Sequence, residues 1–176
     1  MKNHRSNTID MFAPVVKPLA EYRRETMEAA KGDGVACPCC DQFVRVYKRT
    51  ITSTMARMLI TGYHKYGVGQ WFHVRELLGQ NDSGPGDFPK LESWGLIERK
   101  AHIQGDDGKR ASGMWRITQK GSDFIHNKCD VPMYVLIYNA VTLGFEGEAL
   151  RIHHALGKKY DYREIMGWTG TGVSAL

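Results

Sequence analysis

The segment LESWGLI, residues 91–97, gives the clearest fold signal in this chain of 176 residues. Gly95 is typical of a helix C-terminus, because glycine adopts a positive φ angle without strain. A short helix is therefore predicted over residues 88–94, with Asp87 as its N-terminal cap. After the helix, residues 96–103 predict a β-strand.

A second segment, WRITQKG at residues 115–121, predicts the partner of that strand and the helix that follows it. Residues 113–118 are expected to pair antiparallel with the first strand, across a loop rich in Gly, Asp and Lys. Thr118 is expected to cap a helix that ends near Asn127. Gly121 lies near the start of this helix, where a residue without a side chain permits close packing.

The region upstream completes a pattern of helices and strands. Residues 50–66 predict the longest helix, since their apolar side chains form one stripe at helical spacing. A short strand over residues 70–74 and a short helix over residues 74–78 are expected to follow. The predicted order over residues 50–127 is therefore helix, strand, helix, helix, strand, strand, helix.

This order and the two quoted segments resemble winged helix-turn-helix domains. In that family the recognition helix commonly ends in Leu-x-x-x-Gly-Leu-Ile, and the second wing strand commonly leads into Tyr-x-Leu-Thr-x-Lys-Gly. The resemblance covers residues 50–127 and implies that residues 88–94 are the recognition helix and residues 104–112 belong to the wing. Winged helices bind DNA, but they also serve as protein-docking modules. The chain as a whole also resembles small bacteriophage proteins, which implies a phage origin.

The predicted fold class is α+β, with a winged-helix core over residues 50–127. Residues 1–49 are expected to precede the core as an arm, a helix over residues 18–31, a Cys-rich turn and a strand over residues 43–49. Residues 128–176 are expected to add a C-terminal β-hairpin and short helices that pack on the core.

The predicted hairpin joins residues 133–138 to residues 141–145 through Asn139-Ala140. Its first arm is apolar on both faces, so it needs cover from both sides. Two roles are open: a layer that completes the core, or a contact surface for a second copy of the chain or for a host or phage protein.

Composition indicates a globular protein. Hydrophobic residues make up 42% and charged residues 24% of the chain, which excludes wholesale disorder. No apolar run approaches the roughly 20 residues of a membrane helix, and the first residues lack the apolar stretch of a secretory signal. We therefore expect a cytoplasmic protein, in the host cytoplasm if it is phage-encoded, with no membrane partner. No catalytic motif is recognisable, so the chain is not expected to be an enzyme.

Four cysteines in a cytoplasmic chain indicate metal ligands, redox groups or buried thiols rather than disulfides. Cys37-x-x-Cys40 and His126-x-x-Cys129 together would supply three thiolates and one imidazole, a ligand set typical of structural zinc. Cys39 is an alternative chelating partner of Cys37. The other interpretation is that these cysteines are ordinary thiols.

A net charge of +5 and an isoelectric point near 9.0 favour a polyanionic partner. Basic residues cluster around the predicted wing and ahead of the long helix, so duplex DNA is the expected partner, although a solvated hairpin would have the same charges. The predicted recognition helix carries Asp87, Lys90 and Glu92, which favours backbone contacts through the wing over reading of bases. The predicted nucleic-acid-binding residues are Lys90, Arg99, Lys100, Lys109, Arg110, Arg116, Lys120, Arg45, Lys48 and Arg49.

The leading hypothesis is a non-enzymatic nucleic-acid-binding protein, a phage-encoded regulator that contacts duplex DNA mainly through a basic wing. The alternative is a protein-interaction module of phage origin that docks on a host or phage complex without binding DNA. The near-neutral recognition helix favours the alternative, whereas the basic wing favours DNA.

Overall fold

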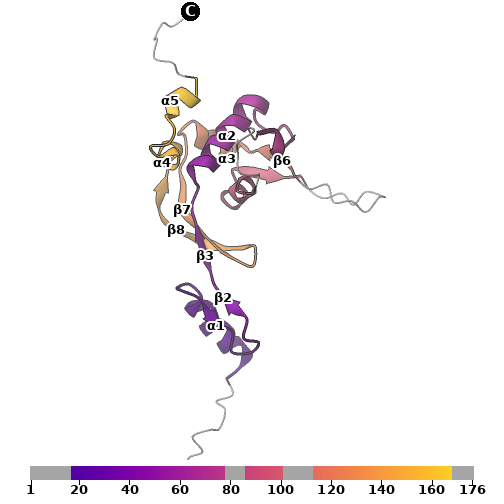
Figure 1. Cartoon of the computed structure of the whole chain (residues 1–176), viewed down its shortest axis with the longest axis vertical. Coiled ribbons are helices and arrows are strands. Elements are labelled where there is room, and N and C mark those ends of the chain that lie inside the picture. Colours follow the sequence, from indigo (N-terminus) through magenta and orange to yellow (C-terminus); the bar gives the residue numbers. More distant parts are fainter. Residues whose placement is uncertain (1–16, 78–85, 101–112, 168–176) are drawn as a thin grey trace, which may run out of the picture. The chain divides into compact units, whose positions relative to one another are not determined.

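The computed structural model describes residues 17–77, 86–100 and 113–167. The chain divides into two compact units, with the boundary between Val46 and Tyr47 (Figure 1). The described residues up to Val46 are called the N-terminal unit below, and those from Tyr47 onward the C-terminal unit. Helices and strands both occur, which confirms the α+β class.

The N-terminal unit consists of one helix and one short β-hairpin. Helix α1 spans Leu19–Ala29, within the range that the sequence predicts. Strands β1 (Val35–Ala36) and β2 (Phe43–Val44) pair antiparallel and flank the cysteine turn. The backbone N–H of Val46 donates to the carbonyl oxygen of Ala30 at 2.8 Å, so the chain after the hairpin returns to the end of α1.

The single strand expected over residues 43–49 is wrong, because this segment is divided between the two units. Strand β2 ends at Val44, and β3 (Tyr47–Arg49) pairs with a strand of the C-terminal unit. The physical reason lies at Val46, whose N–H bonds to the end of α1 rather than to a neighbouring strand. Val44 and Val46 are buried, whereas all three residues of β3 are exposed.

The first part of the C-terminal unit contains the elements predicted for residues 50–127, in the predicted order. The elements α2, β4, η1, η2, β5, β6 and α3 span Ser53–Tyr66, Phe72–His73, Val74–Leu77, Phe88–Trp94, Ile97–Arg99, Met114–Ile117 and Gln119–Ile125. Strand β6 is the centre of an antiparallel sheet of order β4-β6-β5. Helix α2 packs against β6 and against η1, η2 and α3. The hairpin arm β5 therefore lies at one edge of this sheet.

The two short helices, η1 and η2, are 3₁₀ helices. In η2, Pro89 lacks an N–H and the N–H of Lys90 donates to the carbonyl oxygen of Asp87 at 3.1 Å, which is the bond of a 3₁₀ turn. The expected cap at Asp87 is wrong: its carboxylate caps no backbone N–H and instead accepts from the Lys90 ammonium group. Core packing anchors η2 instead, through the buried side chains of Phe88, Leu91 and Trp94.

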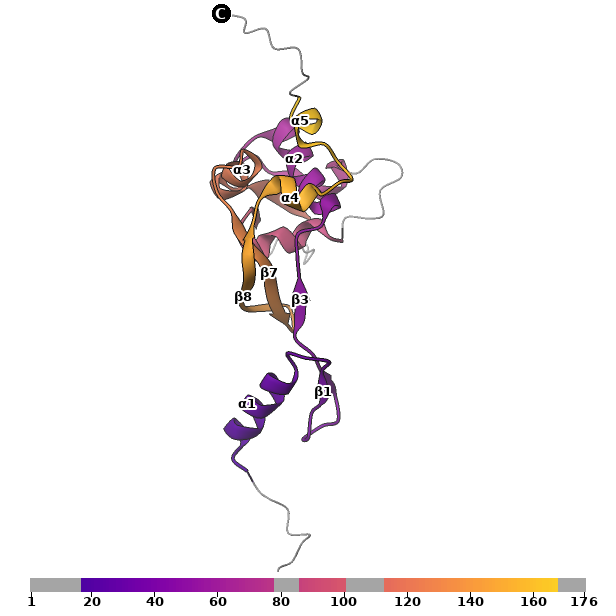
Figure 2. The same ribbon diagram turned by 90° about the vertical axis from the view of Figure 1, so that its left-hand side faces the viewer.

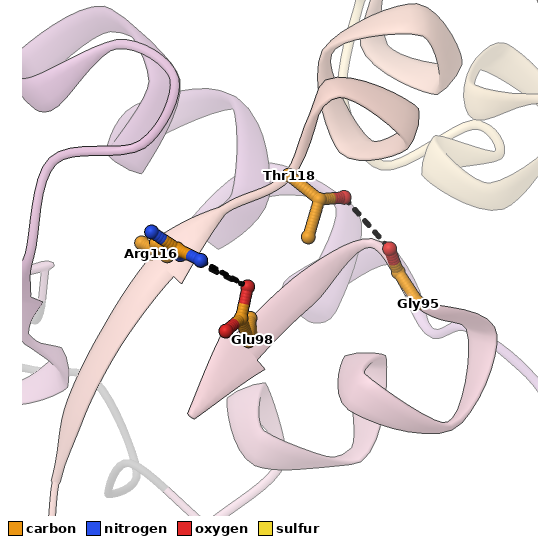
Figure 3. Close-up of polar contacts among 4 residues, drawn as sticks. All are labelled: Gly95, Glu98, Arg116 and Thr118. Atoms are coloured by element: carbon orange, nitrogen blue, oxygen red, sulfur yellow. Dashed lines mark hydrogen bonds and ion pairs between the residues drawn. The ribbon is translucent and has the colours of Figure 1, made fainter. Parts of the chain in front are cut away.

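A junction at Gly95, Thr118 and Gly121 joins η2, β5, β6 and α3. Figure 3 shows the Gly95 and Thr118 part of it. Gly95 has φ 71° and ψ 19°, the left-handed conformation that the sequence predicts. The hydroxyl group of Thr118 donates to the Gly95 carbonyl oxygen at 2.7 Å and accepts from the Gly121 N–H at 3.0 Å. A Cβ atom at Gly121 would lie 2.1 Å from the carbonyl oxygen of Leu96, so glycine allows α3 to lie this close to β5.

The remaining strands form a second sheet of order β3-β7-β8 (Figure 2). Strands β7 (Val131–Tyr138) and β8 (Val141–Leu150) form the expected antiparallel hairpin, and the turn residues Asn139 and Ala140 both have positive φ. Two short helices follow, α4 over Ile152–Leu156 and α5 over Tyr162–Ile165.

One hydrophobic cluster joins both sheets of the C-terminal unit. Helix α4 packs against α2, and the indole N–H of Trp94 in η2 donates to the Pro132 carbonyl oxygen of β7 at 2.8 Å. The C-terminal hairpin is therefore part of the same packed unit as α2 and β6. None of the described helices is long and apolar enough to cross a membrane.

The Gly121 contact predicts a large effect of a single methyl group. Gly121→Ala should lower the free energy of unfolding by about 2–3 kcal/mol, because the new Cβ atom meets backbone that cannot move freely. Gly144→Ala is the matched control: nothing lies within 4 Å of a Cβ atom there, so its effect should stay within about 0.5 kcal/mol. Urea denaturation of both variants measures this, and equal stability of the two would contradict the described packing.

Candidate nucleic-acid interface and cysteine sites

The predicted basic residues lie in three places rather than in one cluster. Arg45 belongs to the N-terminal unit, while Lys48 and Arg49 lie in β3 of the second sheet. Lys109 and Arg110 lie outside the described residues. The basic residues around the β5–β6 hairpin and its neighbours are Lys90, Arg99, Lys100, Arg116 and Lys120. This last group is the hairpin face.

Two cations of the hairpin face lie over one half-buried indole ring, that of Trp71. The Arg116 guanidinium carbon is 4.7 Å from the centroid of the ring, and the Lys100 ammonium nitrogen is 5.9 Å from it. Arg116 also forms a two-pronged ion pair with Glu98, with N···O distances of 2.9 and 2.7 Å (Figure 3). These two residues are directly opposite in the β5–β6 ladder.

Carboxylates close to the hairpin face partly neutralise its charge. Arg99 lies over the ring of Trp115, 4.8 Å from the centroid, and is 3.3 Å from a carboxylate oxygen of Glu92 in η2. Lys90 pairs with Asp87. Such exposed pairs are typically worth only about 0–1 kcal/mol. A phosphate group can therefore replace these carboxylates at little cost.

A cavity of about 340 Å³ lies between η1, η2 and the base of the hairpin. Nδ1 of His73 accepts the backbone N–H of Arg75 at 3.2 Å, which leaves the proton of the neutral ring on Nε2. The indole nitrogen of Trp115 is buried without a hydrogen-bond partner among the described residues. The described lining residues include no carboxylate; they are His73, Val74, Arg75, Gly86, Pro89, Arg99, Gly113 and Trp115. The polar side chains of the cavity are therefore hydrogen-bond donors, which suits an anion.

Sequence reasoning missed four residues of this region: Trp71, His73, Arg75 and Trp115. The available signal was the position of His73 in the short strand β4 and of Trp71 just before it, together with a tryptophan in β6. These positions meet through the pairing of β4 with β6, where Phe72 is opposite Trp115 and His73 is opposite Met114. That register cannot be deduced from spacing along the chain.

The cysteine turn lies between β1 and β2 and is closed by backbone hydrogen bonds. The N–H of Cys37 donates to the Gln42 carbonyl oxygen at 2.8 Å, and the N–H of Asp41 donates to the Cys37 carbonyl oxygen at 2.9 Å. Asp41 has a positive φ of 58°. Hydrogen bonds to the Cys37 sulfur lower the pKa of its thiol. The largest effect comes from the backbone N–H of Cys39, followed by the thiol and the backbone N–H of Cys40.

The other two predicted zinc ligands lie in the C-terminal unit and have partners there. Nδ1 of His126 is 2.8 Å from the Ser122 carbonyl oxygen, and its ring contacts that of Tyr63 edge-on. The Cys129 thiol donates to the Lys120 carbonyl oxygen at 3.7 Å. The predicted Cys₃His set is thus divided between the two units, and the described residues contain no group of three or more metal-ligating side chains.

Three apolar residues of β8 in the second sheet are exposed. Val141, Leu143 and Phe145 are 59%, 46% and 46% exposed. These three residues are called the hairpin patch below, although Phe145 is opposite Val135 and Val141 is opposite Tyr138, so these two side chains lie on different faces of the sheet. The predicted hairpin therefore completes the core with Val131, Val135 and Leu150, yet leaves the hairpin patch uncovered among the described residues.

Comparisons with models of protein families, with curated proteins and with solved structures found no match to this chain.

The environments of the cysteines predict their order of alkylation. Hydrogen bonds lower the pKa of Cys37, whereas burial raises the pKa of Cys129, so at neutral pH the reactive thiolate is more populated at Cys37. In the reduced, metal-free chain, iodoacetamide should label Cys37 first and Cys129 last, as read by peptide mass mapping. Unfolding in urea should equalise the two rates. Faster labelling of Cys129 in the folded chain would show that the described thiol environments are wrong.

Proposed function

We propose that residues 50–127 form a winged helix that binds duplex nucleic acid through the hairpin face. Support for the winged helix comes from the order of elements and from the sheet order β4-β6-β5, in which the last two strands form a hairpin. The observation that carries the nucleic-acid function is the position of Lys100 and Arg116 over the half-buried Trp71 ring. Arg99 lies over the buried Trp115 ring on the other side of the two strands. Cations on a strand hairpin beside flat aromatic surfaces are suited to a phosphate backbone.

The proposed contact is with the backbone rather than with base edges. Helix η2, which corresponds to the recognition helix, has only seven residues, and three of them are buried in the core. Of its polar side chains, Lys90 is paired with Asp87, and Glu92 with Arg99. Few side chains are left to read the major groove, so binding should depend weakly on sequence.

Binding requires exchange of ion-pair partners on the hairpin face. Glu92 and Glu98 hold Arg99 and Arg116 in the free protein. A duplex offers a continuous row of phosphates, and release of its condensed counterions supplies the free energy for this exchange. The affinity should therefore fall steeply as salt rises. Arg75 and Arg99 at the cavity add donors next to the same hairpin.

Removing charge from the wing tests this function. Lys109→Ala combined with Arg110→Ala should weaken binding about equally for different duplex sequences and reduce the slope of log affinity against log salt by about 2, since each lost phosphate contact removes about one. Lys158→Ala combined with Lys159→Ala is the matched control, because it removes the same charge from exposed residues after α4. The measurement is fluorescence anisotropy of labelled duplexes. Affinity that does not change with salt, or equal losses in both double variants, would refute the proposed interface.

The second candidate function is protein docking through the hairpin patch. The observation that favours it is the exposure of Val141, Leu143 and Phe145 in β8, which is an edge strand of its sheet. An edge strand with exposed apolar side chains can pair with a strand of another chain. The simplest partner for such a surface is a second copy of the chain.

If the hairpin patch binds a second copy of the chain, one substitution in it should prevent dimer formation. Phe145→Glu should abolish concentration-dependent dimer formation in sedimentation equilibrium, because a charge would be buried in an apolar contact. Ala149→Glu, which adds the same charge at an exposed residue near the other end of β8, should leave association intact. A wild-type chain that stays monomeric at all concentrations would contradict docking of a second copy.

A further inference from the structure

The N-terminal unit has almost no hydrophobic core. Helix α1 has no buried residue, and each strand of the hairpin contains two residues. The apolar residues of the described unit that are buried are Ala30, Val44 and Val46. Units shorter than about 40 residues generally need a disulfide, a metal or a partner to be stable. Something besides apolar burial must therefore stabilise residues 17–46.

The cysteine turn has the geometry of a metal-binding knuckle. Cys37 and Cys40 are three residues apart in the turn between β1 and β2, and the pair is 3.6 Å apart. Asp41 takes the left-handed conformation that turns the chain back into β2. Two cysteines at C-x-x-C spacing on the turn of a β-hairpin are the arrangement of a zinc knuckle.

We propose that Cys37 and Cys40 bind Zn²⁺ as two thiolates, and that this ion stabilises the fold of the N-terminal unit. Thiolates in a C-x-x-C turn are the ligands that structural zinc prefers, and zinc has no redox chemistry to disturb the pair. Metal binding then supplies the folding free energy that the unit lacks in apolar burial. This function is separate from nucleic-acid binding and does not depend on the hairpin face.

Cys39 does not belong to the proposed ligand pair, although it lies in the same turn. Cys39 and Cys40 are both exposed, so the ligand pair is assigned from the C-x-x-C spacing of zinc knuckles, which Cys37 has with Cys40 and not with Cys39. Tetrahedral zinc needs two ligands besides Cys37 and Cys40. A ratio of one zinc per chain would indicate that the same chain supplies these two ligands. A ratio of one zinc per two chains would indicate that Cys37 and Cys40 of a second copy supply them.

Metal analysis of the full-length chain tests the ligand pair. Protein purified without added metal and without chelator should contain about 0.5–1 zinc per chain, and so should Cys39→Ser. Cys37→Ser and Cys40→Ser should each contain less than about 0.2. A wild-type chain that contains less than about 0.2 zinc would overturn the proposal, and this includes a chain whose intact mass shows a Cys37–Cys40 disulfide. Zinc that is lost in Cys39→Ser but kept in Cys40→Ser would also overturn it.

Hydrogen exchange tests the effect of the metal on folding. Treatment with a chelator should speed exchange of the amides of Cys37 and Val46, whose hydrogen bonds close the turn and join the hairpin to α1. Amides of α2, from Met55 to Ile60, should be unaffected, because they belong to the packed core of the C-terminal unit. Unchanged exchange in the N-terminal unit would show that zinc, even if bound, does not hold it together.

Discussion

The close approach of helix α3 to strand β5 is the contact on which the C-terminal unit depends. Gly121 lies against the Leu96 carbonyl oxygen, and Thr118 bonds both to Gly95 and to Gly121. This contact sets where η2 ends, where β5 begins and how the β5–β6 hairpin leaves the core. Because Arg99 and Arg116 of the hairpin face project from these two strands, their position follows from the packing of one backbone against another rather than from electrostatics.

Nearby carboxylates limit how strongly the basic side chains of the hairpin face can attract an anion. The four cations Lys90, Arg99, Arg116 and Lys48 each have a carboxylate partner within the chain. These pairs reduce the positive potential that the four side chains would otherwise present. Lys48 lies in the second sheet rather than beside the β5–β6 hairpin. It pairs with Glu146 of that sheet and lies 4.3 Å from the centroid of the Tyr134 ring. The predicted β3 group is therefore not part of the proposed interface.

Features that depend on local chemistry could be predicted from the sequence. Gly95 takes its left-handed cap, Thr118 caps α3, and Asn139-Ala140 turns the hairpin, because each requires only a few neighbouring residues. The division of the strand at Val46 could not be predicted, because it depends on a hydrogen bond to the distant Ala30. The cavity beside Trp115 was missed for the same reason: strand register brings its residues together. The zinc ligand set was drawn from spacing alone, and its two halves lie in different units.

The most direct test of the central claim, that duplex nucleic acid binds the hairpin face, is the indole N–H spectrum of the protein during titration with a short duplex. The resonances of Trp71 and Trp115, assigned by substitution with Phe, report on the hairpin face. The resonance of Trp94 is an internal control, since its N–H is bonded to Pro132 inside the core. The account predicts that Trp71 and Trp115 shift with the duplex at low salt, return as salt is added, and leave Trp94 unchanged. Binding of the duplex without a shift at Trp71 and Trp115 would contradict it.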